Sequence, residues 1–323
     1  MVWRDGVHIC DTPIWCDARR AQEVCFVSAP HAVAQTRHGQ LIGTATTLSL
    51  LPSGQDGTGP ESRLPIPYDR PFTLGTRRLE LLRSGHAIGS ASLSITVDGQ
   101  RILYAGAVCP AGSGLSDPAD CRPCDALILA ADYGDPRYVL PPRSEAIGET
   151  LAFARDVITR GGVPVLLLSS PPKALDVLAE LGAAQIPAVG HRAFARAAQR
   201  LRASGVVIPP LRRARSAPSA GAALLWPASA RGRLDAVQLP KASRVALVSG
   251  AAARDDAIAA IRADAGFAWS NQADFQDLVG YVEGAGAERV YTTGACARRF
   301  AEAVARPGRP AVPLAPPEQL ALF

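Results

Sequence analysis

The first half of the chain alternates apolar and polar positions over short stretches. Segment 78–85 reads RLELLRSG, and segment 90–108 reads SASLSITVDGQRILYAGAV. Alternate residues of a strand face opposite sides of a sheet, so this pattern predicts half-buried strands. The dipeptide Asp98-Gly99 predicts a hairpin turn inside the second stretch. Segment 125–131, DALILAA, is a short apolar run typical of a buried strand.

The pattern changes after Pro141, where stretches with helical spacing alternate with short apolar runs. This alternation is typical of a parallel sheet covered by helices. We predict helices over 145–162, 171–183, 193–205, 274–286 and 297–305, and strands over 163–170, 244–250 and 288–293. A further helix is expected after the strand 244–250 and through Ile261. Segment 209–222, PPLRRARSAPSAGA, is expected to be a basic loop.

The chain length and the apolar content limit the number of domains that these elements can form. With 323 residues, of which 48% are hydrophobic, the chain can build two domains or one domain with a large insertion. No apolar run approaches the ~20 residues of a membrane span, and residues 1–30 do not have the form of a secretory signal. We therefore expect a soluble, cytoplasmic protein without a membrane partner.

The seven cysteines are scattered, which favours reduced thiols over a disulfide framework. Cys121 and Cys124 form a CxxC pair, with Cys109 upstream, and could be read as part of a zinc site. No second CxxC pair or histidine pair completes such a site, so we interpret these residues as buried or loop thiols.

The net charge of +5 is compatible with nucleic acid but is modest. Arg212, Arg213 and Arg215 form the densest basic cluster and are the candidate contacts to phosphates. A solvated surface loop is the alternative interpretation.

Five stretches, taken together and in order, resemble the metallo-β-lactamase-fold nucleases of the β-CASP group. The resemblance is greatest to the bacterial DNA-ligase-associated exonucleases and their relatives in messenger-RNA 3′-end processing. The stretches are WCDARRAQEVCFVSAPHA, LLRSGHAIGSASLSITVDGQRILYAGAV, CDALILAADYGDPRY, VALVSG and AWSNQADFQDLVGYVEGAGAERVYTTGA.

The resemblance implies an α/β fold, namely a metallo-β-lactamase αββα sandwich with an inserted α/β β-CASP domain. The sandwich would comprise residues 1–145 and 265–306. The β-CASP-like domain would comprise residues 146–264, and residues 307–323 would form a proline-rich tail.

Members of this family hold two metals that activate a water for phosphodiester attack, and most of the ligands are missing here. The HxHxDH motif of the family matches residues 29–34, APHAVA, in which only His31 survives. The next motif, GHxxGS, is intact at 85–90 and supplies His86. The remaining ligand positions of the family carry Ala107, Ala130, Gln272 and Gly294.

A two-metal site needs about six to seven oxygen and nitrogen ligands, which His31 and His86 cannot supply. We interpret both histidines as relics that hydrogen-bond neighbouring backbone, and we expect neither catalytic residues nor a cofactor. The alternative is a rebuilt zinc or manganese site, and five residues outside the family's ligand positions are candidates for it: Cys16, Asp17, Cys25, His38 and Asp132.

Residues 319–323, QLALF, resemble the peptide by which many bacterial repair and replication proteins dock on the polymerase sliding clamp. Leu320, Leu322 and Phe323 would fill an apolar cleft, and the Gln319 amide would fix the register by hydrogen bonds. The preceding segment 306–318, RPGRPAVPLAPPE, is suited to a semi-extended spacer. The alternative is that these side chains fold back onto the protein's own core.

Three functional hypotheses follow from these features. The first is a catalytically inactive accessory or scaffold protein in DNA repair or replication, docked on the DNA polymerase sliding clamp, with DNA and an active nuclease or ligase as further partners. The second is a divergent metal-dependent exonuclease or phosphodiesterase with a rebuilt site. The third is a protein-interaction module without affinity for DNA.

Overall fold

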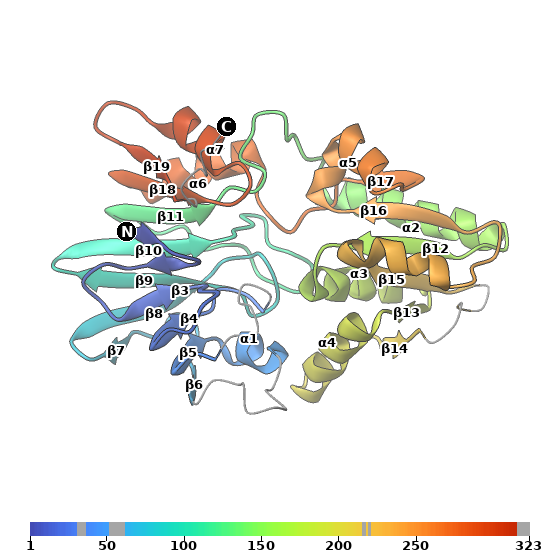
Figure 1. Ribbon diagram of the computed structural model, residues 1–323, viewed down its shortest axis with the longest axis horizontal. Coiled ribbons are helices and arrows are strands. Elements are labelled where there is room, and N and C mark those ends of the chain that lie inside the picture. Colours follow the sequence, from blue (N-terminus) through green and yellow to red (C-terminus); the bar gives the residue numbers. More distant parts are fainter. Residues whose placement is uncertain (31–36, 52–61, 215–217, 219–220, 315–323) are drawn as a thin grey trace, which may run out of the picture. The chain divides into compact units, whose positions relative to one another are not determined.

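The computed structural model describes residues 1–30, 37–51, 62–214, 218 and 221–314. The chain forms two compact units. Unit 1 comprises residues 1–112, 116–137 and the chain from 272 onward, and unit 2 comprises residues 113–115 and 138–271 (Figure 1). Of the described helices, none combines the length and the apolar character needed to cross a membrane.

Unit 1 contains two sheets (Figure 1). The six-stranded sheet runs in chain order through β1 (Val2–Trp3), β2 (Val7–His8), β3 (Ile14–Cys16), β4 (Val24–Phe26), β5 (Gln40–Gly43) and β6 (Ser62–Pro65). The seven-stranded sheet has the order β19 (Ala311–Pro313), β18 (Arg289–Thr293), β11 (Ala126–Ala130), β10 (Gln100–Gly106), β9 (Ala91–Val97), β8 (Arg77–Arg83) and β7 (Phe72–Leu74). Strands β7 to β10 pair antiparallel, whereas β10, β11, β18 and β19 are parallel.

The two sheets of unit 1 pack face to face through one apolar core. Phe26 and Ile42 from the first sheet meet Leu81, Leu93 and Ile95 from the second. The outer face of the first sheet packs on α1 (Ala45–Leu50), and the outer face of the second packs on α6 (Phe275–Ala285) and α7 (Ala297–Val304). Unit 1 is therefore layered as helix, sheet, sheet and helices.

The alternating stretches of the first half form the predicted strands. Leu79 and Leu81 of β8 face the core between the sheets, whereas Leu82 faces the helices on the outer side. The turn between β9 and β10 lies at Asp98 and Gly99, whose φ angles are +48° and +82°. Two successive positive φ angles are typical of the tight hairpin turn that this dipeptide favours.

Unit 2 is a six-stranded parallel sheet. Its order is β14 (Arg212–Arg213), β13 (Ala188–Gly190), β15 (Ala223–Pro227), β12 (Pro164–Leu168), β16 (Arg244–Val248) and β17 (Ala265–Phe267). Every residue of β12 is buried, as expected for a central strand of a parallel sheet covered on both faces. The α/β class predicted from the sequence is confirmed.

The helices after residue 141 follow the predicted pattern closely, whereas α1 was not predicted. They are α2 (Arg143–Thr159), α3 (Pro171–Ala183), α4 (Arg192–Ala203), α5 (Asp255–Ala260), α6 and α7. The helix expected after the strand 244–250 and through Ile261 is divided into the 3-10 turn η2 (Gly250–Ala253) and α5, because Arg254 has an extended backbone between them. A second 3-10 segment, η1 (Ala228–Ala236), follows β15. The predicted basic loop contains one two-residue strand, β14, at the edge of the sheet.

A buried polar cluster ties the first and last segments of unit 2 to α3. Asp176 accepts a hydrogen bond from Leu115 N at 3.2 Å and another from the Asn271 amide. Lys173 Nζ donates to Asn271 Oδ1 at 3.0 Å and lies 4.2 Å from the centre of the Trp269 ring. The charged side chains of Lys173 and Asp176 are both buried, so each compensates the other in a medium of low dielectric.

Removing one of these two charges should destabilise unit 2. We expect Lys173→Met to lower the free energy of unfolding by up to about 3–5 kcal/mol, because Asp176 would remain buried with Arg143 as its remaining neighbouring cation. The double variant Lys173→Met/Asp176→Leu should recover most of that loss. Urea denaturation measures both, and a double variant as unstable as the single one would contradict the pairing.

A cavity at the candidate metal-ligand positions

The sheet topology of unit 1 brings the candidate ligand positions together. Strands β10, β11 and β18 are parallel neighbours, so their carboxyl ends meet at the same edge of the sheet. Ala107 follows β10, Ala130 ends β11 and Gly294 follows β18, and all three line one cavity of about 310 Å³. The same cavity is lined by Ala29, which lies shortly after β4, and by Gln272.

His86 also lines this cavity and is almost fully buried. It belongs to the turn between β8 and β9, and its neighbour Gly85 has a φ of +69°. A Cβ on Gly85 would overlap the carbonyl oxygen of Cys109, so the turn requires glycine there. Inside the turn, Ser90 Oγ accepts from Ala87 N at 2.9 Å and contacts Ser84 Oγ at 2.7 Å. Ser90 is therefore a structural residue of the turn.

Three hydroxyl groups from other segments hold the far end of this turn. Thr44 and Thr47 of the α1 region donate to the Gly89 carbonyl at 2.5 and 2.7 Å. Tyr68 donates to the Ser90 carbonyl at 2.8 Å. The GHxxGS segment thus keeps its shape through hydrogen bonds that involve no metal.

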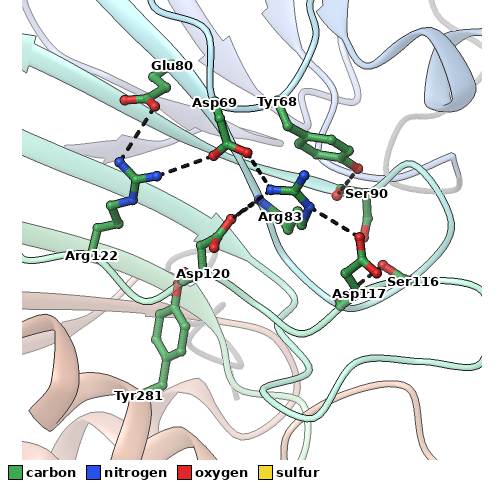
Figure 2. A network of polar contacts seen from close by, with 10 residues as sticks. All are labelled: Tyr68, Asp69, Glu80, Arg83, Ser90, Ser116, Asp117, Asp120, Arg122 and Tyr281. Atoms are coloured by element: carbon green, nitrogen blue, oxygen red, sulfur yellow. Dashed lines mark hydrogen bonds and ion pairs between the residues drawn. The ribbon is translucent and has the colours of Figure 1, made fainter.

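Figure 2 shows the ion-pair network that anchors the strand leading into the turn. Arg83, the last residue of β8, lies 2.5 Å from Asp69 and 3.3 Å from Asp117, and its guanidinium stacks 5.0 Å from the centre of the Tyr68 ring. Asp120 accepts from Arg83 N at 2.9 Å, and its carbonyl accepts from the Tyr281 hydroxyl. Hydrogen bonding to Asp69 is the main cause that raises the pKa of Arg83.

A second buried cluster, formed by Asp17, Ser28 and Tyr104, lines the cavity from the other side. The Asp17 carboxylate accepts from Ser28 N at 2.8 Å, from Ser28 Oγ at 2.5 Å and from the Tyr104 hydroxyl at 2.8 Å. Asp17 follows β3 and has a φ of +51°, a left-handed conformation that aspartate tolerates better than most residues. Burial raises the pKa of Asp17, and the three hydrogen bonds oppose that rise.

Asp132 occupies the space beside Gly294, a position at which the resembled family carries a metal-binding histidine. It follows β11, and its carboxylate accepts from Ala295 N at 3.0 Å. Gly294 has a φ of +90°, and a Cβ built on it would lie 2.5 Å from Asp132 Oδ1. A histidine side chain at position 294 would therefore collide with Asp132 unless the loop moved.

The residues around the cavity do not fit a two-metal centre. Positions 29, 107 and 130 present only methyl groups, and position 294 presents no side chain. The Asp17 carboxylate already accepts three hydrogen bonds. Across the part of the chain that the structure describes, no three histidine, cysteine, aspartate or glutamate residues gather in a way that could hold a metal ion.

The remaining candidates from the sequence separate into two groups. Cys16, Asp17 and Asp132 line the cavity, whereas Cys25 and His38 are buried elsewhere in unit 1. Desolvation lowers the pKa of His38 and raises that of Cys25 to about 12, so both are neutral at pH 7. His31 lies outside the described residues.

The cysteines of the CxxC segment take part in ordinary packing. The Cys109 thiol donates to the Gly112 carbonyl, and the Cys121 thiol donates to the Tyr281 carbonyl. Cys124 is buried in the core beneath α6 and α7, and burial raises its pKa to about 12. All seven thiols are free.

The candidate phosphate contacts belong to unit 2. Arg212 and Arg213 form the exposed edge strand β14, and Arg215 lies outside the described residues. Gln319, Leu320, Leu322 and Phe323 also lie outside them, so docking on a clamp stays a prediction. The Asp17–Ser28–Tyr104 cluster was not predicted, because Tyr104 is 87 residues from Asp17 and no motif marks the contact.

We expect a pH-dependent effect from Asp17→Asn. Because the folded-state pKa of Asp17 is raised, the folded protein binds this proton more tightly than the unfolded chain does. The protonated group stabilises the fold at low pH, and this contribution is lost as pH rises through the folded pKa.

The stability advantage of wild type over Asp17→Asn should therefore shrink from about pH 4 to neutral pH, by at most about 1.4 kcal/mol per pH unit. Denaturation at several pH values measures it. Asp11→Asn, at an exposed aspartate with a φ of +61°, is the matched control. An advantage that grows with pH would contradict the assignment.

The network of Figure 2 predicts a difference between two arginines of the same strand. Arg83→Leu should lower the free energy of unfolding by about 1–2 kcal/mol, because it leaves three neighbouring carboxylates without their shared cation. Arg78→Leu, on an exposed position of β8, should change it by less than about 0.5 kcal/mol. Equal losses in the two variants would show that the network does not hold the strand.

Two known proteins are similar in sequence to this chain, although no family model matches it. The chain is 27% identical over 319 residues to a protein of Opitutus terrae named "Probable DNA ligase", a match that covers 98% of this chain and 31% of that protein. It is 29% identical over 103 residues to an "RNase J-like protein" of Methanocaldococcus jannaschii, covering 31% of this chain and 24% of that protein. The chain thus spans about a third of the length of the first relative. The name of the second relative agrees with the expected relationship to nuclease-like proteins, and the name of the first agrees with the expected connection to DNA ligation.

Proposed function

We propose that this chain is a non-catalytic relative of the metallo-β-lactamase-fold β-CASP nucleases and acts as an accessory or scaffold protein in DNA repair or replication. In this proposal the four layers of unit 1 correspond to the metallo-β-lactamase sandwich. Unit 2 corresponds to the inserted β-CASP domain.

One observation carries the proposal. Six positions that would hold metal ligands in an active member line the same cavity, and five of them carry alanine, glycine or glutamine. Phosphodiester hydrolysis by two metals requires a set of ligands that fixes both ions and activates water. His86 remains at the cavity, but it is one ligand of the six or so that such a centre needs.

The relative named "Probable DNA ligase" supports a partnership with DNA ligation. Nearly the whole of this chain matches one third of that protein. A module in the same polypeptide as an enzyme acts on it at a high effective concentration. We infer that this chain serves a ligase or a nuclease as an accessory that positions it on DNA.

The segment Gln319–Phe323 would supply attachment to the sliding clamp. Its leucine and phenylalanine side chains suit an apolar cleft, and a glutamine amide can fix the register of an extended peptide. Most of the spacer predicted over 306–318 belongs instead to unit 1, because β19 pairs with β18 and Leu314 packs in the core, so only residues 315–318 would serve as the spacer before the peptide.

The second candidate function, a divergent phosphodiesterase, rests on the carboxylates and the thiol that share the cavity with His86. Asp17, Asp132 and Cys16 are groups that can bind zinc or manganese. A rebuilt site would have to release Asp17 from its hydrogen bonds to Ser28 and Tyr104, which makes this function the weaker proposal.

Metal content and cleavage, measured on the same sample, distinguish the two functions. We expect less than stoichiometric zinc and manganese, and no cleavage of single-stranded DNA, duplex DNA or RNA when either metal is added. His86→Ala should behave like wild type in both measurements. Stoichiometric metal that disappears in His86→Ala together with cleavage would establish the phosphodiesterase instead.

Clamp docking is tested by removing residues 319–323. Binding to the purified sliding clamp should fall below detection, and the melting temperature should stay within about 1 °C of wild type if the peptide serves the clamp and not the protein's own core. Leu322→Ala/Phe323→Ala should weaken binding by at least tenfold, whereas the matched change Pro316→Ala/Pro317→Ala in the spacer should leave binding nearly unchanged. Undiminished binding of the truncated protein would overturn this part of the proposal.

A further inference from the structure

The positive charge of the chain is concentrated in one segment. Residues 181–234 contain nine arginines and neither aspartate nor glutamate. Without these nine, the 34 basic residues of the chain become 25, against 29 acidic residues, so the rest of the chain is net acidic. A general bias of the genome toward arginine does not explain this separation of charge.

The fold of unit 2 gathers part of this segment around a cavity of about 430 Å³. Arg192, Arg196 and Arg202 of α4 line it together with Arg213 of β14 and Gln199. All four arginines are exposed, and none of the four forms an ion pair with another described residue. The guanidinium of Arg202 donates to the Ile208 carbonyl at 3.0 Å, which fixes one end of the row.

A neighbouring histidine, His191, lies close to the same arginines. His191 caps the first turn of α4 through Nδ1, which accepts from Ala193 N. Burial is the first cause that lowers the pKa of His191, and repulsion from Arg192, Arg233 and Arg213 lowers it further. The cavity is thus a region of positive potential that no described acid neutralises.

One end of the cavity lies at the carboxyl ends of two strands. Arg192 lies just after the carboxyl end of β13, and Arg213 lies at the carboxyl end of β14. From there the cavity follows α4 along the edge of the sheet. Arginines on the edge strand β14 would also discourage pairing with another sheet, but that role does not account for the arginines of α4.

We propose that this cavity, which we call the α4 arginine groove, binds the phosphodiester backbone of a nucleic acid strand. Ten residues separate Arg192 from Arg202, so the row extends about 15 Å along the helix. At about 3.4 Å of axis per phosphate along one strand of a duplex, this length matches about four phosphates, and it matches fewer in a more extended single strand. A row of guanidinium groups with no acidic neighbour recognises a chain of phosphates rather than a single one.

This inference deepens the function proposed above, on which it rests for the choice of nucleic acid among phosphate-bearing ligands. It extends the candidate phosphate contacts from Arg212, Arg213 and Arg215 to a groove built on α4. Phospholipid headgroups carry the same phosphodiester chemistry, so the test includes both sources.

The test measures the binding of a fluorescein-labelled single-stranded oligonucleotide by fluorescence anisotropy, between about 50 and 200 mM salt. The full chain is compared with Arg192→Gln/Arg196→Gln/Arg213→Gln. The control is Arg155→Gln/Arg160→Gln/Arg244→Gln, which removes the same charge from exposed positions of unit 2 outside the groove. Circular dichroism melting verifies that all three proteins are folded.

We expect the groove variant to bind at least tenfold more weakly at low salt. The slope of the logarithm of the binding constant against the logarithm of the salt concentration should be less steep by about two. Each phosphate that is no longer neutralised by an arginine reduces this slope by about 0.7. The control should bind within about threefold of wild type, because scattered charges contribute only screened, long-range attraction. Vesicles of phosphatidylglycerol should bind wild type no better than the control.

Three outcomes would each contradict a different part of the proposals. Equal weakening of the two triple variants would overturn the groove while leaving a role with DNA intact. Vesicle binding that depends on the groove arginines, with DNA binding unchanged, would assign the groove to lipid and overturn the proposal. A wild-type protein that binds no DNA at low salt would reject both the groove and the proposed nucleic-acid role.

Discussion

The parallel pairing of β10, β11 and β18 is the constraint on which the cavity of unit 1 depends. Parallel strands end at one edge of a sheet, so the residues that follow them meet there whatever their chemistry. This explains why Ala107, Ala130 and Gly294 come together although they lie far apart in the sequence. The backbone hydrogen bonds of the sheet create the site, and the identity of the side chains decides only what the site can do.

The apolar core explains how the chemistry of such a site can disappear while the fold is kept. The two sheets meet through large buried side chains such as Phe26, Leu81 and Ile95, none of which lines the cavity. The His86 turn is fixed by hydroxyl–carbonyl bonds and by the Arg83 network (Figure 2). Alanine at a ligand position therefore removes coordination and charge but leaves the framework almost unchanged.

Strong periodicity in the sequence predicted the long elements well. Segments such as 171–183 and 274–286 have the spacing and the capping residues of helices, and they form α3 and α6. Strands of two or three residues, such as β1, β13 and β14, were not predicted, because so short a segment carries no period. Their place in a sheet is set by tertiary pairing.

The candidate site was predicted only in part, for a related reason. The motif spacing located six ligand positions that the fold does bring together. The Asp17–Ser28–Tyr104 cluster and the α4 arginine groove depend on contacts between residues distant in sequence, and no local pattern reports them. The net charge of the whole chain did not reveal the groove either, because the acidic remainder cancels part of the charge of the basic segment.

The central claim is that unit 1 keeps its structure without a metal. The most direct measurement is the melting temperature of the protein after exhaustive dialysis against a chelator, and again after addition of zinc or manganese. A ligand that binds only the folded state raises stability by RT ln(1 + [L]/Kd), so a metal-dependent fold must respond. We expect the same melting temperature in every condition, whereas a fall on chelation that zinc or manganese restores would contradict the claim.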